Sequence, residues 1–99
     1  MKKDSFKMSA LPVGYKAKVS ELIDRGRNIT ERLRDLGISD GEEVMCVMKS
    51  PLGEPSAYLI KGSVIALRQE DAGVVRMFSD SVARFTKERS KAEEIWARN

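Results

Sequence analysis

Apolar and polar positions change their period several times along the chain, and each change marks the border of a short element. Over residues 14–23, Tyr15, Ala17 and Val19 alternate with polar residues. This alternation predicts a strand with one buried and one solvated face. Four later runs combine strand length with apolar, β-branched or aromatic residues, and we expect strands there too: residues 43–49, 57–60, 63–67 and 74–77.

Between the first two expected strands the pattern becomes helical. Ile29, Leu33 and Leu36 are spaced i, i+4 and i+7 and would share one helical face. Asn28 precedes them, and its side-chain oxygen can accept from the unpaired N–H groups of a first helical turn. Gly37 follows them and supplies the left-handed conformation at which helices commonly end. The sequence therefore predicts a short helix that begins at Asn28 and ends at Gly37.

The connections between the strands have recognisable turn chemistry. Lys61 and Gly62 separate two strands by two residues, the length of a tight hairpin turn. The segment SPLGEP, residues 50–55, contains two prolines and a glycine, so we expect a loop there. Short strands at this spacing are typical of a small β-barrel, and the expected fold class is all-β.

The C-terminal residues 79–99 have a different pattern. Val82, Phe85, Ala92 and Trp96 recur at helical spacing, with Arg89 as the one interruption. We expect a C-terminal helix. Its aromatic residues need an apolar partner, either the chain's own barrel or another subunit in a homo-oligomer, and the sequence leaves both open.

Composition limits the class of protein. The 99 residues, 41% hydrophobic and 33% charged, suit one globular domain. No apolar run approaches the roughly 20 residues that span a bilayer, and the lysines near the N-terminus lack the apolar stretch of a signal peptide. A single cysteine suits a reducing compartment. We expect a cytoplasmic protein.

The net charge of +3 is unevenly distributed. Residues 1–27 hold seven Lys and Arg against three acids, whereas residues 28–78 hold six against eight. A concentrated basic face, which nucleic-acid binding requires, is therefore not expected in the barrel. We interpret the lysines of residues 1–9 as a solvated basic segment, with contact to an anionic membrane surface as the less favoured alternative.

Catalytic chemistry has few candidates. The chain has no histidine, which removes the commonest general base and the commonest zinc ligand. Cys46 and Met48 would share one face of a strand while Met45 points the other way. Such a thiol and thioether are soft metal ligands, but buried residues of these types usually fill a core. We expect no enzyme, no cofactor and no metal site, with a transition metal at Cys46 as the weaker alternative.

Several short motifs occur in a fixed order with compatible spacing. With them the chain resembles the FeoA family, small cytosolic proteins of bacterial ferrous iron uptake. The resemblance covers residues 10–77, with Glu54 standing where the family usually has Asp. The motifs are LPVG at 11–14, RLRDLG at 32–37, SPLGEP at 50–55, Tyr58 and IALR at 65–68.

The resemblance implies a fold and a function. The fold would be an SH3-like β-barrel of about five strands over residues 10–78, with a short helix after strand 1 and a helical extension over residues 79–99. The function would be that of a cytosolic accessory protein that binds the cytosolic part of a FeoB-type membrane iron transporter.

The expected contact surface is the SPLGEP loop. Leu52 is its apolar residue, and the sequence alone permits it either to cap the end of the barrel or to form an exposed contact for a partner. The resemblance favours the second, and the residues assigned to the partner surface are Ser50, Pro51, Leu52, Gly53, Glu54 and Pro55.

Two alternatives from other classes remain. The same barrel resembles the C-terminal domain of iron-dependent repressors, which would make the chain a regulatory domain, although their helix-turn-helix and metal ligands are missing. A direct metal carrier is the other alternative.

Overall fold

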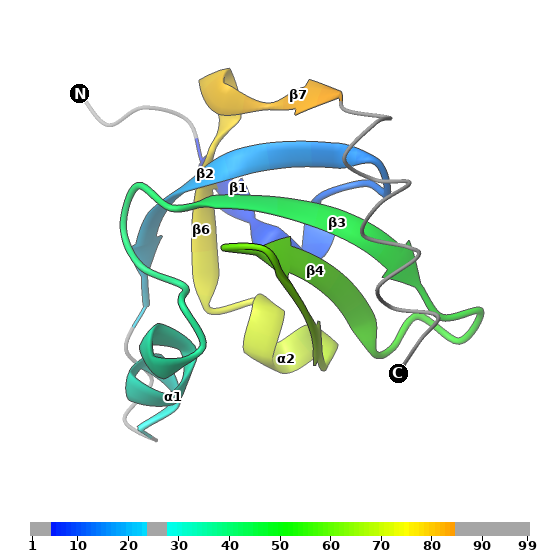
Figure 1. Cartoon of the computed structure of the whole chain (residues 1–99), viewed down its shortest axis with the longest axis horizontal. Helices are drawn as coiled ribbons and strands as arrows, with labels where there is room; N and C mark the ends of the chain where they lie inside the picture. The colour runs from blue at the N-terminus through cyan, green and yellow to red at the C-terminus, as the bar shows by residue number, and fades with distance from the viewer. Residues whose placement is uncertain (1–4, 24–27, 85–99) are drawn as a thin grey trace.

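The computed structural model describes residues 5–23 and 28–84 (Figure 1). Within these ranges seven strands, two short α-helices and two 3-10 helices follow one another. In chain order they are β1 (Ser5–Lys7), η1 (Met8–Ala10), β2 (Tyr15–Leu22), α1 (Ile29–Asp35), β3 (Glu43–Lys49), β4 (Ser56–Ile60), β5 (Ser63–Leu67), α2 (Gln69–Ala72), β6 (Val75–Phe78), η2 (Ser79–Ser81) and β7 (Ala83–Arg84). Neither α-helix in the described ranges has the length and hydrophobicity needed to cross a membrane.

The strands form one antiparallel sheet in the order β1-β6-β2-β3-β4-β5, and β7 also pairs with β2. The long strand β2 connects the two parts of this sheet. Its first half pairs with β3 and β7, and its second half pairs with β6, with an irregularity between Val19 and Glu21 inside this second pairing. The sheet therefore bends around its core in the SH3-like manner, but the pairings among the described strands do not close it into a ring.

The expected all-β class and its five predicted strands are confirmed. Two strands were not predicted, because β1 and β7 contain only three and two residues and are too short to show a period. β1 lies in the segment that the sequence analysis set apart as basic, and Met8 directly after it is fully buried. Between β5 and β6 the chain forms the short helix α2.

The prediction of a helix from residue 79 onward is wrong for the part that the structure describes. η2 and β7 occupy residues 79–84. The Ser81 hydroxyl accepts the backbone N–H of Lys18 at 2.8 Å and donates to the Phe78 carbonyl at 2.7 Å. Residues 79–84 therefore lie along the edge of β2, held there by the bond to Lys18 and by the pairing of β7 with β2. Residues 85–99, the rest of the expected C-terminal helix, lie outside the described ranges.

The core lies between the two parts of the sheet and beneath α1. Leu33 of α1 and Tyr58 of β4 are fully buried in it, together with Cys46. The Tyr58 hydroxyl donates to the Met8 carbonyl at 3.5 Å. Burial raises the pKa of Tyr58 to about 12, the nearby Cys46 charge adds to the rise, and a hydrogen bond with Ser56 opposes it. The core therefore favours the neutral phenol.

The end of α1 has the geometry predicted for it. Gly37 has φ +101°, and its N–H donates to the Arg34 carbonyl at 3.0 Å. The N–H of Ile38 donates to the Leu33 carbonyl at 3.0 Å, and both of these side chains are fully buried. This is the Schellman arrangement, in which a left-handed residue pairs the last carbonyls and an apolar contact seals the end.

Two other predictions for this helix are wrong. Asn28 stands at the cap position, but it has φ +57° and its side chain makes no capping hydrogen bond. A capping side chain requires an extended backbone, whereas this residue is left-handed. Leu36 is 41% exposed, because α1 already ends at Asp35 and the chain turns before Leu36 can face the core with Ile29.

The predicted hairpin turn between β4 and β5 is confirmed. Lys61 has φ +50° and Gly62 has φ +80°. Positive φ at both central residues is the type I′ geometry that fits the twist of a hairpin. Gly62 therefore has a conformational reason to be glycine, and it has open space around it.

Gly37→Val should destabilise the protein by about 1–3 kcal/mol, since a β-branched residue is strained at positive φ. A Cβ there would also lie 3.4 Å from Ile60 Cγ2. Thermal and urea unfolding measure the loss. Gly37→Asn is the matched control and should lose less, because Asn tolerates left-handed backbone better. Equal stability of the Val variant and the native protein would contradict this account of the helix end.

The raised pKa of Tyr58 predicts a loss of stability at high pH. The folded state holds this proton more tightly than the unfolded chain, where the pKa is 10.0. The contribution is therefore complete below pH 10 and is lost as the pH rises from about 10 to about 12, by on the order of 2 kcal/mol. Urea unfolding across this window should show a smaller loss for Tyr58→Phe than for the native protein. Equal losses would mean that other groups cause the effect.

Candidate functional site

The SPLGEP loop, residues 50–55, connects β3 to β4 and is held by its own hydrogen bonds. The Ser50 backbone N–H and hydroxyl donate to the Pro55 carbonyl at 3.3 and 2.9 Å. The Gly53 N–H donates to the Ser50 carbonyl at 2.8 Å, and Gly53 has φ +91°. The peptide bond between Glu54 and Pro55 is cis. The loop is thus a closed turn with a defined shape.

Leu52 projects from the tip of this loop. Its side chain is 94% exposed, the largest exposure among the large hydrophobic residues of the described chain. The alternative that Leu52 caps the end of the barrel is therefore wrong. Pro51, Gly53, Glu54 and Pro55 are exposed as well. The loop presents one aliphatic side chain to solvent on a short hydrogen-bonded turn.

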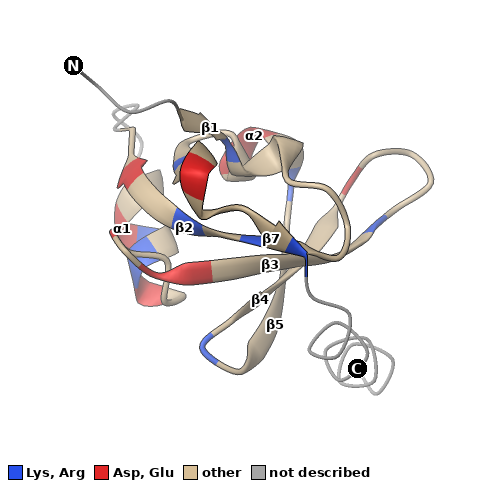
Figure 2. Ribbon diagram, turned by 90° about the horizontal axis from the view of Figure 1, so that it is seen from above, with Lys and Arg blue, Asp and Glu red and all other residues tan. Residues whose placement is uncertain are grey.

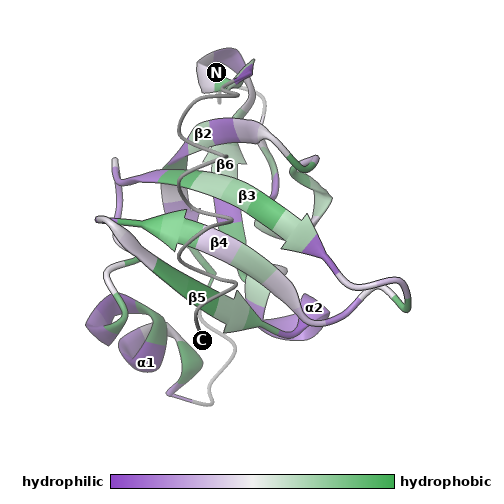
Figure 3. Cartoon of the chain, turned by 45° about the vertical axis from the view of Figure 1, so that its right-hand side comes forward, coloured by the Kyte–Doolittle hydropathy of each residue, from purple (hydrophilic) through white to green (hydrophobic). Residues whose placement is uncertain are grey.

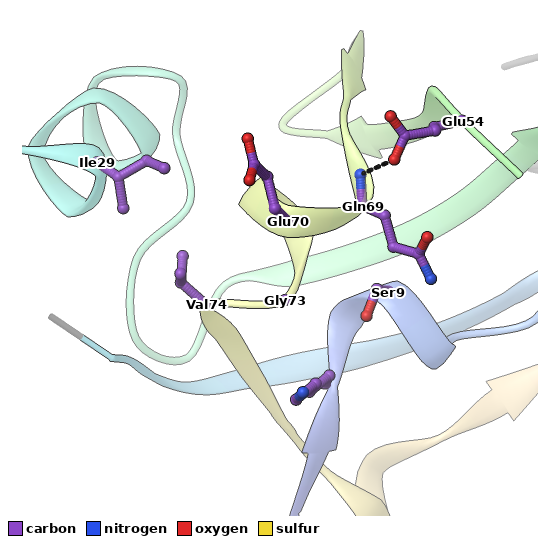
Figure 4. A pocket seen from close by; sticks show the side chains of 8 residues that line it. Ser9, Ile29, Glu54, Gln69, Glu70, Gly73 and Val74 are labelled. Carbon is purple, nitrogen blue, oxygen red and sulfur yellow. Dashed lines mark hydrogen bonds between the residues drawn. The ribbon is translucent and has the colours of Figure 1, made fainter. Parts of the chain in front are cut away.

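A cleft of about 630 Å³ begins at the base of this loop. Figure 4 shows Glu54 and Gln69 at the end near the loop, and Ile29 and Val74 at the end near α1. The Gln69 backbone N–H donates to Glu54 Oε2 at 3.4 Å, which connects the loop to the start of α2. The remaining lining residues are Lys7, Ser9, Glu70 and Gly73. The cleft is therefore polar near the loop and apolar near α1.

An ion pair joins α1 to α2, two of the elements that line this cleft. Arg32 Nη2 lies 3.1 Å from Asp71 Oδ2, and Arg68 Nε lies 3.7 Å from the same oxygen. The Asp71 side chain is only 6% exposed, and its Oδ1 has no hydrogen-bond partner among the described residues. The sequence gives no signal for this contact, because 39 positions separate Arg32 from Asp71 and no local pattern relates them.

The predicted common face of Cys46 and Met48 is wrong. The register of β3 against β4 shifts between them, so that Cys46 pairs with Tyr58 and Met48 pairs with Ala57. Tyr58 and Ala57 are neighbours in β4 and point to opposite faces. Cys46 therefore lies in the main core, whereas Met48 packs against Val47 and Ala57. An extra residue in the strand moved Met48 to the other face.

Charged groups of both signs are mixed over the described surface. Figure 2 shows Lys and Arg beside Asp and Glu on α1, and charges of both signs on β2. Several of the basic groups lie beside acids, as in the pairs Lys16–Glu43 at 3.3 Å and Lys61–Glu42 at 3.4 Å. This distribution differs from the concentrated basic face of a nucleic-acid binder.

Comparisons with known proteins identify a FeoA domain in this chain. The FeoA domain model matches residues 6–77. FeoA of Stenotrophomonas maltophilia, solved in complex with zinc, is 36% identical with a TM-score of 0.75, over 82% of this chain and 99% of that one. It is described as a prokaryotic SH3 domain protein and a candidate ferrous iron transport activating factor. No curated protein sequence matches the chain.

More distant structures share the fold. The FeoA-like protein of Clostridium acetobutylicum is 23% identical, with a TM-score of 0.69 over 88% of this chain and 93% of that one. A manganese-dependent transcriptional repressor is 15% identical, with a TM-score of 0.73 over 80% of this chain but only 38% of the repressor. This likeness shows that the SH3-like fold also occurs within repressors.

The zinc of the Stenotrophomonas protein has no matching donor set in the described part of this chain. No three His, Cys, Asp or Glu side chains in those ranges form a group that could hold a metal ion. Cys46 is fully buried, and the chain has no histidine. The described residues therefore do not fit a zinc site.

Cys46→Ala should reduce the free energy of unfolding by about 1–2 kcal/mol, because it leaves a small cavity in the core. It should not change the amount of ferrous iron or zinc that the protein retains after dialysis. Metal content and urea unfolding, measured on one preparation, give both quantities. Met48→Leu, which conserves volume on the opposite face, is the control. Loss of bound metal in a folded Cys46→Ala variant would restore the metal-carrier alternative.

Proposed function

The chain belongs to the FeoA family, and from this membership we propose that it binds and assists a FeoB-type membrane transporter of ferrous iron. The family is linked to ferrous iron transport and has an accessory SH3-like domain. On this proposal the chain acts in the cytoplasm, where it meets the cytosolic part of the transporter. It is a protein-binding module and performs no reaction of its own.

The observation that carries the proposal is the exposure of Leu52. A leucine that is 94% exposed buries no apolar area in the folded monomer. The same side chain would lose most of its contact with water in a complementary depression of a partner, which favours binding by roughly 1.5–3 kcal/mol before other costs. A few well-buried side chains often contribute most of the affinity of an interface.

The hydrogen bonds of the SPLGEP loop support the same role. Ser50 and Pro55 close the loop at its base, and Gly53 bonds back to Ser50. A loop that already has a defined conformation loses less entropy when it binds. We therefore propose that residues 50–55 enter a groove of the transporter with Leu52 as the anchor.

The cleft beside the loop extends the proposed contact surface. Glu54 belongs to the loop and also lines the cleft, so a partner segment that covers Leu52 can continue toward Ile29 and Val74. The Arg32–Asp71 pair fixes the relative position of α1 and α2, which supply Ile29 and Glu70. A partner would then contact three features one after another: the apolar side chain of Leu52, the polar part of the cleft at Glu54, and its apolar end at Ile29 and Val74.

The regulatory alternative has one supporting observation, the SH3-like fold that this chain shares with a manganese-dependent repressor. At 15% identity this likeness concerns the fold alone. The family match over residues 6–77 supports the role of transporter accessory instead.

Leu52→Asp tests the proposal. Because Leu52 is exposed, the variant should melt within a few degrees of the native protein, since surface substitutions usually change stability by less than about 0.5 kcal/mol. A charge buried at an interface without a partner is costly, so capture of the purified cytosolic part of a FeoB-type transporter should fall at least about tenfold. Binding is measured by surface plasmon resonance on the same preparation.

Ser63→Asp is the matched control, because it adds the same charge at an exposed position in the other hairpin. It should bind as the native protein does. Leu52→Ala should weaken binding by a smaller factor than Leu52→Asp. If the folded Leu52→Asp variant binds the transporter like the native protein, the SPLGEP loop is not the contact surface.

A further inference from the structure

The sheet ends on one side at β5. In the strand order β1-β6-β2-β3-β4-β5, this strand pairs with β4 and with no other described strand. Figure 3 shows β5 as the last strand of this part of the sheet, below β4, with hydrophobic residues along much of its length. We call the side of β5 that faces away from β4 the open edge.

The turn before β5 fixes the direction of the backbone groups along the strand. Lys61 and Gly62 form the two-residue turn, and Ile60 and Ser63, which flank it, are a hydrogen-bonded pair in a hairpin of this type. Hydrogen-bonded pairs alternate with non-hydrogen-bonded pairs along an antiparallel ladder. The next residue of β5, Val64, therefore directs its N–H and C=O away from β4.

Val64 and Ala66 both present their backbone groups at the open edge, because they are two residues apart on one strand. No backbone hydrogen bond outside the β4–β5 ladder involves either residue in the described part of the chain. Ala66 is exposed and Val64 is half-buried. Two N–H donors and two C=O acceptors are therefore accessible to a further strand.

β5 lacks the features that commonly protect the edge of a sheet. Such edges contain a charged residue or a proline, or the strand is very short. β1, at the other end of the strand order, has three residues and includes Lys7. β5 has five residues, SVIAL, with neither charge nor proline, and its register against β4 is regular. The open edge therefore suits an uncharged, apolar strand.

A second copy of β5 is such a strand, and its backbone groups have the matching spacing. When two copies lie antiparallel with Ile65 opposite Ile65, Val64 of each copy lies opposite Ala66 of the other. These two pairs can exchange four backbone hydrogen bonds. The two Ile65 residues form the non-hydrogen-bonded pair at the centre, where side chains lie closest. Ile65 is only half-buried in the single chain, so the pairing would bury more of it.

The charges at the two ends of β5 are compatible with this arrangement. The antiparallel register places Arg68 of one copy opposite Gly62 of the other, close to Lys61. Each of these cations already lies beside an acid of its own chain. Lys61 Nζ is 3.4 Å from Glu42 Oε1, and Arg68 Nη2 is 3.3 Å from Glu70 Oε1. The approach of the two copies therefore brings together no uncompensated like charges at these positions.

We propose that the chain forms a two-fold dimer by antiparallel pairing of the open edges of β5. A contact through one five-residue strand is smaller than the roughly 1,200–2,000 Å² of a stable interface, so the dimer is weak and reversible. The SPLGEP loop lies just beyond Ser56, which pairs with Leu67 at the end of β5. The two loops of a dimer therefore lie at opposite ends of the joined strands. The proposal does not depend on binding to a transporter.

Amide hydrogen exchange, followed residue by residue by NMR, tests the pairing. In dilute solution the Val64 and Ala66 amides should exchange much faster than those of Ile65 and Leu67, which bond to β4. At high concentration the exchange of Val64 and Ala66 should slow several-fold, while that of Ile65 and Leu67 stays unchanged. Light scattering should show the average mass rising from that of one chain toward that of two.

Ala66→Pro removes an N–H from the open edge and leaves the bonds to β4 in place, since proline is tolerated on an edge strand where its nitrogen faces solvent. The variant should keep the β-sheet circular dichroism and stay monomeric at concentrations at which the native protein is dimeric. Ala66→Lys, which places a charge on the same edge, should do the same and replaces the proline variant if that one does not fold. Leu52→Asp is the control and should dimerise as the native protein does.

Three results would overturn the proposal. The first is a native protein that remains monomeric at the highest concentration used for NMR. The second is a dimer that persists in the folded Ala66 variants or is lost in Leu52→Asp. The third is a dimer in which the Val64 and Ala66 amides still exchange rapidly, because the contact would then lie elsewhere on the chain.

Discussion

Much of this structure depends on the hydrogen bonds of one strand, β2. It pairs with β3 and β7 along its first half and with β6 along its second half. An irregularity lies within the pairing with β6, between Val19 and Glu21, and such an irregularity increases bend and twist. A straight β2 would leave β6 and β3 in one flat layer. The bend instead places Val19 and Met77 on the same side as Tyr58, within one core.

The SPLGEP loop is attached directly to the paired strands that form the core. The β3–β4 ladder ends with the pair Lys49 and Ser56, and the loop begins immediately beyond it. Leu52 therefore lies on a loop that is anchored at both ends in paired strands. The Glu54 contact to Gln69 adds a third attachment, to α2. Binding sites on such short, anchored loops keep their geometry while their exposed residues vary.

Local physics explains which parts of the fold the sequence could predict. The alternation in β2, the left-handed stop at Gly37 and the hairpin at Lys61 and Gly62 each depend on a few neighbouring residues. The exposed position of Leu52 followed from the turn residues around it together with the family resemblance. The residues of the loop were thus available from the sequence, whereas the cleft beside it was not, because four separate stretches of the chain build it.

The features that the sequence did not predict depend on distant contacts. The shift of register after Cys46 is decided by how β3 meets β4, so the face of Met48 was assigned wrongly. The pairing of Arg32 with Asp71 requires α1 and α2 to be side by side. Asn28 adopted a left-handed backbone instead of the extended one that capping needs. β1 and β7 exist because longer strands offer them an edge, and their own residues contain no comparable signal.

The two-residue strand β7 has a consequence for the behaviour of the protein in a crowded solution. Unpaired strand edges are templates on which other chains add, and this is a route to aggregation. β7 occupies the edge of β2 at Tyr15 and Lys16, and the Arg84 guanidinium lies 5.9 Å from the centre of the Tyr15 ring. Just beyond it, the N–H of Lys18 is taken by the Ser81 hydroxyl. Ser81 and β7 therefore occupy backbone groups of β2 that could otherwise pair with a strand of another copy.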